Sequence, residues 1–555
     1  MRSRISFLTM AAAFALTCTL TCTLSWGQAV TPANAQSNAS VTGKVTSAEE
    51  GAMEGVVVRA KKGIVTVSVV SNARGEFRFP SAKLDAGTYE VSIKAAGYDL
   101  DGPKSITVAG NAPANLDVKL VKTKNLAAQL SNQEWIMSVP GDDSQKRALT
   151  GCTNCHTVER ILMSTHNAEQ FLATIQRMAQ YSNNSFHAKP QIRAEVRDLN
   201  RFVPNADKVA AYFASINRST GEPKYELKTM PRVSGDGTKV VITEYDLPEA
   251  TIQPHDVITD KDGIVWHSDF SGQILGRLDT KTLQHTSFKV PMQREGWPTG
   301  ALDLESDPHG NLWLGLMFQA GTAKFDVKTQ QFQMFQIPAN MIKPDSQTAL
   351  IGPQNWTVDN RIWIQDPARR GVYRINVSTG NTELFEPFGT GPGSPYQILA
   401  DKGNNLWFLN FGGAHIGKID AQSGQISMFQ TPTRGSRPRR GRLDEQGRIW
   451  FGEFYGDRIG MFDTATEKFQ EWEVPGRFFS PYDAAPAKDG HVWTGGMNAD
   501  RILRMNIATG KFTEYPLPHA TNIRRVFVDN NVTPPVFWVG NNHGAAAVKI
   551  EPIVD

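Results

Sequence analysis

The sequence predicts a multidomain, mainly β protein: a small β-sandwich, then an all-α domain, then a seven-bladed β-propeller. Three observations predict this order. Short alternating strands fill residues 40–122, a CxxCH motif followed by apolar residues at helical spacing occupies residues 126–220, and a tryptophan-containing repeat runs through residues 239–555. A chain of 555 residues is long enough for each domain to bury its own core.

The first 35 residues have the features of a secretory signal peptide. Arg2 and Arg4 precede an apolar run, and Ala33-Asn34-Ala35 forms an A-x-A cleavage site, so we expect cleavage after Ala35. An uncleaved anchor is the alternative, but the run is short and contains several threonines. No later stretch is apolar for long enough to span a bilayer, so we expect a periplasmic or secreted protein without a transmembrane anchor.

The net charge and the cysteine content limit which binding partners and which cysteine chemistry we expect. The net charge of +3 is nearly balanced, so neither a nucleic acid nor an anionic membrane surface is an expected partner. Of the four cysteines, Cys18 and Cys22 fall in the signal peptide, which leaves Cys152 and Cys155. We therefore expect the exported protein to contain no disulfide.

Residues 40–122 are expected to form the β-sandwich. Segments 56–58, 64–69 and 89–93 have strand composition, and glycine-containing turns separate them. The stretches VTGKV, GEFRFP, GTY and AGY, which begin at residues 41, 75, 87 and 96, resemble the carboxypeptidase regulatory-like domain. The resemblance implies a Greek-key, transthyretin-like scaffold without catalytic residues, so we expect a structural role.

The CxxCH motif at residues 152–156 predicts covalent haem attachment. Each cysteine sulfur would add to one haem vinyl group, and His156 would become the proximal iron ligand. A zinc site needs a second ligand pair, and the mature chain has no further cysteine. A redox dithiol of the thioredoxin type would follow a strand, whereas the polar segment 142–147 precedes this motif. We therefore expect haem c bound to Cys152 and Cys155.

Two helices are expected after the motif, at residues 168–178 and 206–216. The Tyr212-Phe213 pair in the second helix resembles the C-terminal helix of class I cytochromes c. In that family the distal iron ligand usually lies between the motif and the last helix, which makes Met178 the preferred candidate. The alternatives are His166 and His187, which would give a bis-histidine iron of lower potential, and Met230 after the last helix.

The C-terminal repeat predicts seven propeller blades, because one tryptophan recurs roughly every 43 to 50 residues. The equivalent residues are Trp266, Trp313, Trp363, Trp407, Trp450, Trp493 and Trp538. Only one strand, at residues 546–550, follows the last of them. Residues 240–245 can supply the missing outer strand of the last blade, which would close the ring. We expect the tryptophans to pack in the core between blades.

The repeat resembles the virginiamycin B (streptogramin B) lyase family, most clearly in the sequence IWFGE at 449–453 followed by RIG at 458–460. Family enzymes open a cyclic depsipeptide by elimination at a C–O bond, with Mg²⁺ held by glutamates and a histidine as base. This sequence contains only part of the family's set of catalytic residues. Glu453 keeps a glutamate, Tyr455 stands where the histidine belongs, and the Pro-His pair occurs instead at His255, beside Asp256 and Asp269.

Loops after the tryptophan strands and loops before each blade's first strand should open on one face, since neighbouring strands alternate in direction. The candidate catalytic residues expected around the channel there are His255, Asp256, Asp269, Glu453, Arg439 and Arg440. The two arginines belong either to a solvated loop or to a pocket for an anionic or carbonyl-bearing small molecule, because Arg presents a rigid fork of donors.

The expected function is electron transfer by an exported c-type haem protein, to or from a redox site at the propeller or a periplasmic redox partner. If the protein is an enzyme, an oxidoreductase is favoured over a lyase. One alternative is a Mg²⁺-dependent C–O lyase with an appended cytochrome, and another is a non-catalytic binding module. Neither a quinone-cofactor motif nor a copper-rich histidine cluster is present in the sequence. The substrate, partner, potential and oligomeric state are not defined by these patterns.

Overall fold

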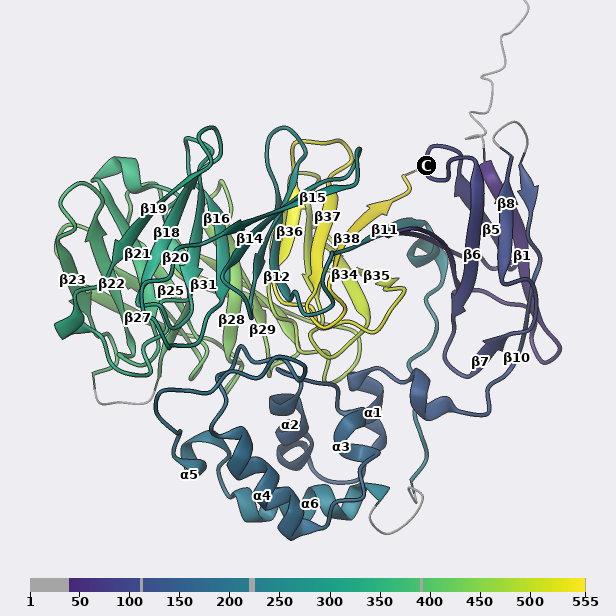
Figure 1. Ribbon diagram of the computed structural model, residues 1–555, viewed down its shortest axis with the longest axis horizontal. Helices are drawn as coiled ribbons and strands as arrows, with labels where there is room; N and C mark the ends of the chain where they lie inside the picture. Colours follow the sequence, from purple (N-terminus) through teal and green to yellow (C-terminus); the bar gives the residue numbers. More distant parts are fainter. Residues whose placement is uncertain (1–38, 110–112, 219–224, 390–392, 555) are drawn as a thin grey trace, which may run out of the picture. The chain divides into compact units, whose positions relative to one another are not determined.

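The computed structural model describes residues 39–109, 113–218, 225–389 and 393–554 (Figure 1). The expected signal peptide and its cleavage site lie outside the described residues. Residues 39–555 form one compact unit by their contacts. Within the described ranges, no helix is both long and apolar enough to cross a membrane.

The N-terminal segment is a β-sandwich of two sheets. One sheet contains β1 (Ala39–Ser47), β2 (Gly51–Ala52), β5 (Glu76–Pro80), β7 (Tyr98–Leu100), β9 (Ala114–Asn115) and β10 (Val118–Lys122). The other contains β3 (Val57–Lys62), β4 (Val65–Val70), β6 (Gly87–Lys94) and β8 (Ser105–Val108). Alternate side chains such as Val41, Val58 and Phe79 are fully buried between the sheets, which is the period-two pattern that the sequence predicted.

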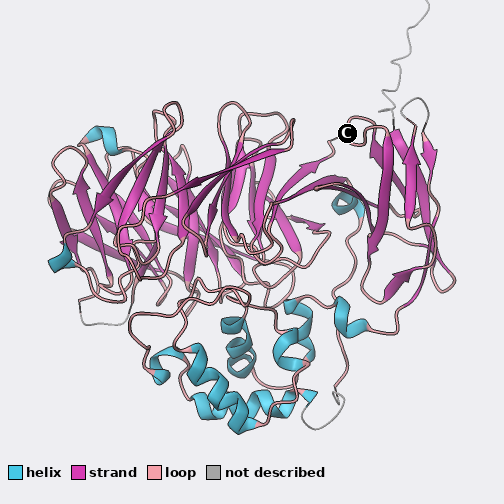
Figure 2. Ribbon diagram, viewed as in Figure 1, coloured by secondary structure: helices cyan, strands magenta, loops and turns pink. Residues whose placement is uncertain are grey.

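Residues 126–216 contain helices, drawn in cyan in Figure 2. They are η1 (Leu126–Gln129), α1 (Asn132–Ser138), α2 (Asp143–Cys152), α3 (Glu159–Leu162), α4 (Ala168–Met178), α5 (Leu199–Phe202) and α6 (Ala206–Ile216). The two helices expected after the motif are confirmed with the same bounds. Among the described residues of this segment, β-structure is limited to two isolated bridges.

Side-chain caps and one apolar core explain these helices. Capping boxes start α1, α2 and α4, where Ser131, Asp142 and Asn167 each accept a bond from the backbone three residues later. Phe171 on α4 packs edge-on against Phe213 on α6, with ring centroids 5.7 Å apart. The segment therefore has a hydrophobic core of its own.

Six four-stranded antiparallel sheets follow in chain order. The first three are β12–β15 (Pro254–Thr259, Val265–Asp269, Ile274–Asp279, Gln284–Lys289), β16–β19 (Ala301–Ser306, Leu312–Leu316, Gly321–Asp326, Gln331–Gln336) and β20–β23 (Ile351–Gly352, Arg361–Asp366, Gly371–Asn376, Thr382–Phe385). The next three are β24–β27 (Pro395–Ala400, Leu406–Asn410, His415–Ile419, Ile426–Gln430), β28–β31 (Pro438–Leu443, Arg448–Glu453, Arg458–Asp463, Lys468–Glu473) and β32–β35 (Ala485–Ala487, His491–Gly495, Arg501–Asn506, Phe512–Pro516).

The seventh blade joins the two ends of the propeller. It consists of β36 (Val526–Asp529), β37 (Val536–Asn541), β38 (Ala546–Pro552) and β11 (Val240–Asp246), and β11 pairs antiparallel with β38 from Val240 to Asp246. The predicted closure of the ring is therefore confirmed. One feature was not predicted: the outer edge of β11 pairs with β4, so blade seven and one sandwich sheet form a single eight-stranded sheet.

The repeated tryptophans are all buried, as expected for core residues. Four of them donate their indole N–H to an aspartate six residues earlier, in the turn before the same strand: Trp266 to Asp260, Trp313 to Asp307, Trp407 to Asp401 and Trp450 to Asp444. The aspartate also accepts backbone bonds within its turn, as Asp307 does from His309 and Asn311. This pairing satisfies a buried donor and fixes the turn at once.

Replacing one of these aspartates should destabilise its blade. Asp307→Ala removes the acceptor of two indoles, Trp313 and Trp356, and should lower the free energy of unfolding by about 1–3 kcal/mol, because a buried donor is left unpaired. Urea unfolding followed by tryptophan fluorescence measures the change. The matched control is Asp262→Ala, an exposed turn aspartate bonded through its side chain to Lys261, which should change stability by less than about 0.5 kcal/mol.

Candidate functional site

The CxxCH motif lies at the C-terminal end of α2. Cys152 is the last residue of the helix, and a tight turn brings the N–H of Cys155 to the carbonyl of Cys152 at 3.4 Å. Both cysteines are free and half-buried. The turn therefore presents two thiols from adjacent positions, as attachment to two vinyl groups of one haem requires.

His156 is oriented for metal binding. Its Nδ1 lies 2.9 Å from the carbonyl oxygen of Thr157, so Nδ1 carries the proton and the lone pair of Nε2 is left for a metal. Burial lowers the pKa of His156, which favours the neutral imidazole that metals bind. Cys152, Cys155 and His156 therefore fit a covalently attached haem with His156 as an axial ligand.

The candidate distal ligands occupy different places. Met178 is half-buried at the end of α4. His187 packs against Phe186 with tilted rings whose centroids are 4.2 Å apart, and the ring of His543 in blade seven lies 6.0 Å from the same Phe186. His166 packs on the helical core, and the side chain of Met230 lies beside Gly476 in the propeller. Met178 stays the predicted ligand.

The two residues between the cysteines contact the propeller directly. Thr153 donates its hydroxyl to Asn498 Oδ1 at 3.0 Å, and Asn522 donates to the carbonyl of Thr153 at 3.0 Å. Arg524 Nη2 donates to the carbonyl of Asn154 at 2.8 Å. Asn498 follows a tryptophan strand, while Asn522 and Arg524 precede the first strand of blade seven. The CxxCH turn is thus hydrogen-bonded to loops on the predicted channel face.

Other parts of the helical segment cover the same face. Asn184 donates to the carbonyl of Phe270 at 2.9 Å, and Gln191 donates to the carbonyls of Ser271 and Thr299, each at 3.0 Å. These loops and those that contact the motif define what we call the channel mouth: Phe270, Ser271, Thr299, Asn498, Asn522, Arg524 and His543. Sequence reasoning missed this contact surface, because single asparagines and glutamines in loops carry no recognisable pattern.

Two of the candidate catalytic residues form a buried pair. His255 and Asp256 on β12 are both completely buried, and His255 Nδ1 lies 2.7 Å from Asp256 Oδ1. Burial lowers the pKa of His255 to about 3, even though Asp256 opposes the shift. His255 is therefore neutral. It keeps its proton on Nδ1 and donates a hydrogen bond from there to Asp256.

Arg440 is committed to an internal ion-pair network. Its guanidinium contacts Asp256 at 2.8 Å and Asp303 at 2.5 Å, and its Nε donates to Gln397 at 2.7 Å. Arg525 contacts Asp256 and Glu305, each at 3.0 Å. All the donors of Arg440 are directed at protein partners, so this residue holds the channel together and does not present a fork to a ligand.

Arg439, its neighbour, is placed differently. Its guanidinium carbon lies 3.9 Å from the ring centroid of Tyr482, 4.4 Å from Phe454, 4.6 Å from Phe411 and 5.4 Å from Tyr396. It is 6 % exposed, its Nε has no hydrogen-bond partner, and none of the ion pairs formed by described residues involves it. Arg439 is therefore a buried cation whose charge is met by aromatic faces.

Asp269 and Glu453 do not join the pair on β12. Asp269 accepts backbone bonds from Gln253 and Ser271, each at 3.1 Å, and so stabilises the turn after β13. Glu453 is completely buried, and burial together with Glu471 raises its pKa to about 9, so it carries a proton at neutral pH. The described residues contain no group of three or more His, Cys, Asp or Glu able to hold a metal ion, so this set does not fit the expected Mg²⁺ site.

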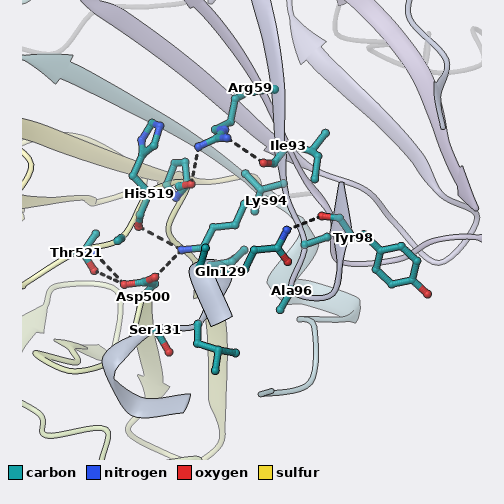
Figure 3. Close-up of a pocket in the computed structure, with 18 of the residues that line it drawn as sticks. Arg59, Ile93, Lys94, Ala96, Tyr98, Gln129, Ser131, Asp500, His519 and Thr521 are labelled. Carbon is teal, nitrogen blue, oxygen red and sulfur yellow. Dashed lines mark hydrogen bonds and ion pairs between the residues drawn. The ribbon is translucent and has the colours of Figure 1, made fainter. Parts of the chain in front are cut away.

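A cavity of about 670 Å³ lies near the CxxCH turn (Figure 3). Thr157 and His543 line it, together with residues of the sandwich, of the helical segment at 128–134, of the chain before β11 and of the propeller around Asp500 and 516–521. Lys94 bridges these parts through Asp500 at 2.7 Å and the carbonyl of Leu517 at 3.0 Å. Positively and negatively charged residues line the cavity. Those with dashed lines in Figure 3 are bonded to other groups of the protein.

Comparison with known proteins agrees with the fold. The virginiamycin B lyase family matches residues 229–494, and the carboxypeptidase regulatory-like domain matches residues 40–121. A streptogramin B lyase structure is similar with a TM-score of 0.50 and 20 % identity, over 57 % of this chain and 100 % of that chain. Virginiamycin B lyase from Staphylococcus aureus gives a TM-score of 0.49 and 20 % identity over the same shares.

No curated protein matches the chain. At 20 % identity, the structural likeness concerns the fold alone. The protein is therefore mainly β and multidomain, with a carboxypeptidase regulatory-like domain at residues 40–121 and a virginiamycin B lyase-like β-propeller that spans residues 229–494 and beyond.

Proposed function

We propose that this chain is an exported c-type haem protein that transfers single electrons. Cys152 and Cys155 would hold the haem, His156 would be the proximal ligand and Met178 the distal one. A haem with two protein ligands supplies one-electron redox chemistry and leaves no open iron site for substrate. The observation that supports this function best is the attachment turn itself, which is hydrogen-bonded to the propeller's channel mouth through Thr153 and Asn154.

The same contacts favour electron transfer over lyase chemistry. The helical segment covers the channel mouth, and beneath it the acid Asp256 is already paired with two arginines. Glu453 is kept protonated by burial and by the neighbouring Glu471. In this proposal the propeller binds the haem segment and holds it in place, and the redox partner is a periplasmic protein.

Arg524 should influence the potential of the haem, because its guanidinium contacts the carbonyl between the two cysteines. A nearby cation stabilises the reduced iron, which carries one positive charge less than the oxidised iron. Arg524→Gln should therefore lower the midpoint potential of the haem-loaded protein, by the equivalent of roughly 1 kcal/mol. A one-electron redox titration followed by the visible spectrum measures it.

Arg504→Gln is the matched control, since Arg504 lies on β34 and pairs with Asp489 away from the motif. This variant should leave the potential unchanged. If haem is present and the potential of Arg524→Gln is unshifted, the propeller does not influence the redox centre. That result would contradict the proposal that the propeller holds the haem segment.

A further inference from the structure

Tyr482 is completely buried next to the residues of the channel mouth. Its hydroxyl meets two other titratable side chains. The hydroxyl of Tyr396 lies 2.6 Å away, and His255 Nε2 lies 3.3 Å away. Tyr482 also precedes the first strand of blade six, which places it in the ring of residues around the channel. No role in the electron-transfer proposal accounts for this arrangement.

Asp256, His255 and Tyr482 form an ordered relay. Asp256 accepts the Nδ1 proton of His255, so the lone pair of Nε2 faces the Tyr482 hydroxyl. His255 can therefore accept the phenolic proton. Because burial lowers the pKa of His255 to about 3, the imidazole does not keep a proton that it accepts from Tyr482.

Buried charged side chains surround Tyr482 in the channel. They include the arginines Arg439, Arg440, Arg442, Arg524 and Arg525 and the carboxylates Asp256, Asp303, Glu305 and Asp483. Arg440, Arg442 and Arg525 pair with those carboxylates. Arg439 and Arg524 form no ion pair with any described carboxylate, although they are only 6 % and 2 % exposed. Such buried unpaired charge is costly unless an anion lies nearby.

Both unpaired arginines face Tyr482. Their guanidinium carbons lie 3.9 Å (Arg439) and 5.7 Å (Arg524) from the centroid of its ring. Burial opposes ionisation of the phenol, but the charges of Arg439, Arg524 and Arg440 outweigh it and lower the pKa of Tyr482. Burial and the neighbouring Tyr482 raise the pKa of Tyr396, so Tyr396 keeps its proton and can donate it.

We propose that Tyr482 is a redox-linked proton site: it loses its phenolic proton by way of His255, and Arg439, Arg524 and the hydroxyl of Tyr396 hold the phenolate that results. The phenolate supplies a negative charge beside Arg439 and Arg524, the two arginines that have no carboxylate partner among the described residues. Tyr396, at 2.6 Å, provides the donor hydrogen bond to it.

Arg524 connects this proton to the haem, a link that rests on the proposed function. The same guanidinium faces Tyr482 and donates to Asn154 between the cysteines. With haem bound, reduction of the iron by a one-electron donor protein would remove one positive charge from the site, and the Tyr482 phenolate would then take up one proton from solvent. Oxidation reverses both steps. Charge and mass therefore balance in each direction.

The first test is an NMR titration of the full-length, haem-loaded protein with tyrosine labelled at Cζ. We expect one of the eleven tyrosines to ionise below the ordinary pKa of about 10. Tyr482→Phe should remove that titration. Tyr373→Phe, which removes another fully buried hydroxyl of the propeller, should leave it unchanged.

Tyr396→Phe keeps the ring and removes only the donor, so it should move the titration to higher pH even if Tyr482→Phe folds poorly. Arg439→Gln should do the same. The inference is overturned if no tyrosine ionises early, or if an added anion such as chloride binds at Arg439 while Tyr482 stays protonated.

The second test is the midpoint potential of the haem as a function of pH. In the wild type it should fall as pH rises through the ionisation of Tyr482, and in Tyr482→Phe it should be flat over that range. An unchanged slope in Tyr482→Phe contradicts the link. A protein without haem would instead refute the proposed function, and the tyrosine titration would still be readable.

Discussion

Arg440→Leu is expected to lower the free energy of unfolding of the propeller by about 3–5 kcal/mol, the largest stability effect of any substitution considered. The side chain is completely buried and contacts Asp256 at 2.8 Å and Asp303 at 2.5 Å. Leucine leaves two buried carboxylates without this cation. Burial already raises the pKa of Asp303 to about 7 against the pull of Arg440, so the loss should drive Asp303 to take up a proton.

Denaturant unfolding followed by tryptophan fluorescence measures the effect. The double variant Arg440→Leu with Asp303→Leu should regain part of the lost free energy of unfolding, because it also removes one of the two buried carboxylates left without this cation. Lys261→Leu, which breaks only the exposed pair with Asp262, is the surface control and should cost no more than about 1 kcal/mol. A change below about 1 kcal/mol in Arg440→Leu would show that the network does not hold the channel together.

Replacing both motif cysteines should have the largest functional effect. Cys152→Ser with Cys155→Ser removes the two sulfur atoms that would bond the haem vinyl groups, and covalent haem should be lost completely. His156 remains, so any haem that still binds should dissociate on denaturation. Haem staining after denaturing electrophoresis reads this out.

Each single cysteine variant is the internal control for the pair. One remaining thioether should retain haem covalently, with an absorption band shifted by the vinyl group left free. Thr153→Ala lies inside the motif but takes no part in attachment, and it should keep full staining while it loses the bond to Asn498. Equal staining of the double variant and the wild type would exclude attachment at these sulfurs.

The sequence predicted the fold well wherever a periodic pattern was present. The tryptophan repeat indicated the blades, and helical spacing indicated α4 and α6 with their observed ends. The ring closure followed from counting strands, because β38 needed an outer neighbour and residues 240–245 were available. The continuation from β11 into β4 was not predictable in this way, since strand composition does not specify a partner across 170 residues of intervening chain.

The site was predicted less completely. The sequence predicted a group of candidate residues around the channel, but the role of each one depends on contacts between distant segments. Arg439 and Arg440 are adjacent and alike in sequence, yet one faces aromatic rings and the other pairs with two aspartates, at a point where the pairing of β28 with β29 shifts its register between Pro438 and Gly441. Tyr482 carries no pattern that predicts its contacts with His255 and Tyr396, because these three residues are distant in sequence and meet only in the folded chain.

The intact mass of the protein, exported by a host with haem-maturation machinery and measured under denaturing conditions, tests the central claim most directly. We predict a single species whose mass is that of the chain without residues 1–35 plus one haem. A mass equal to the polypeptide alone, from cells that attach haem to a control cytochrome c, would contradict the account.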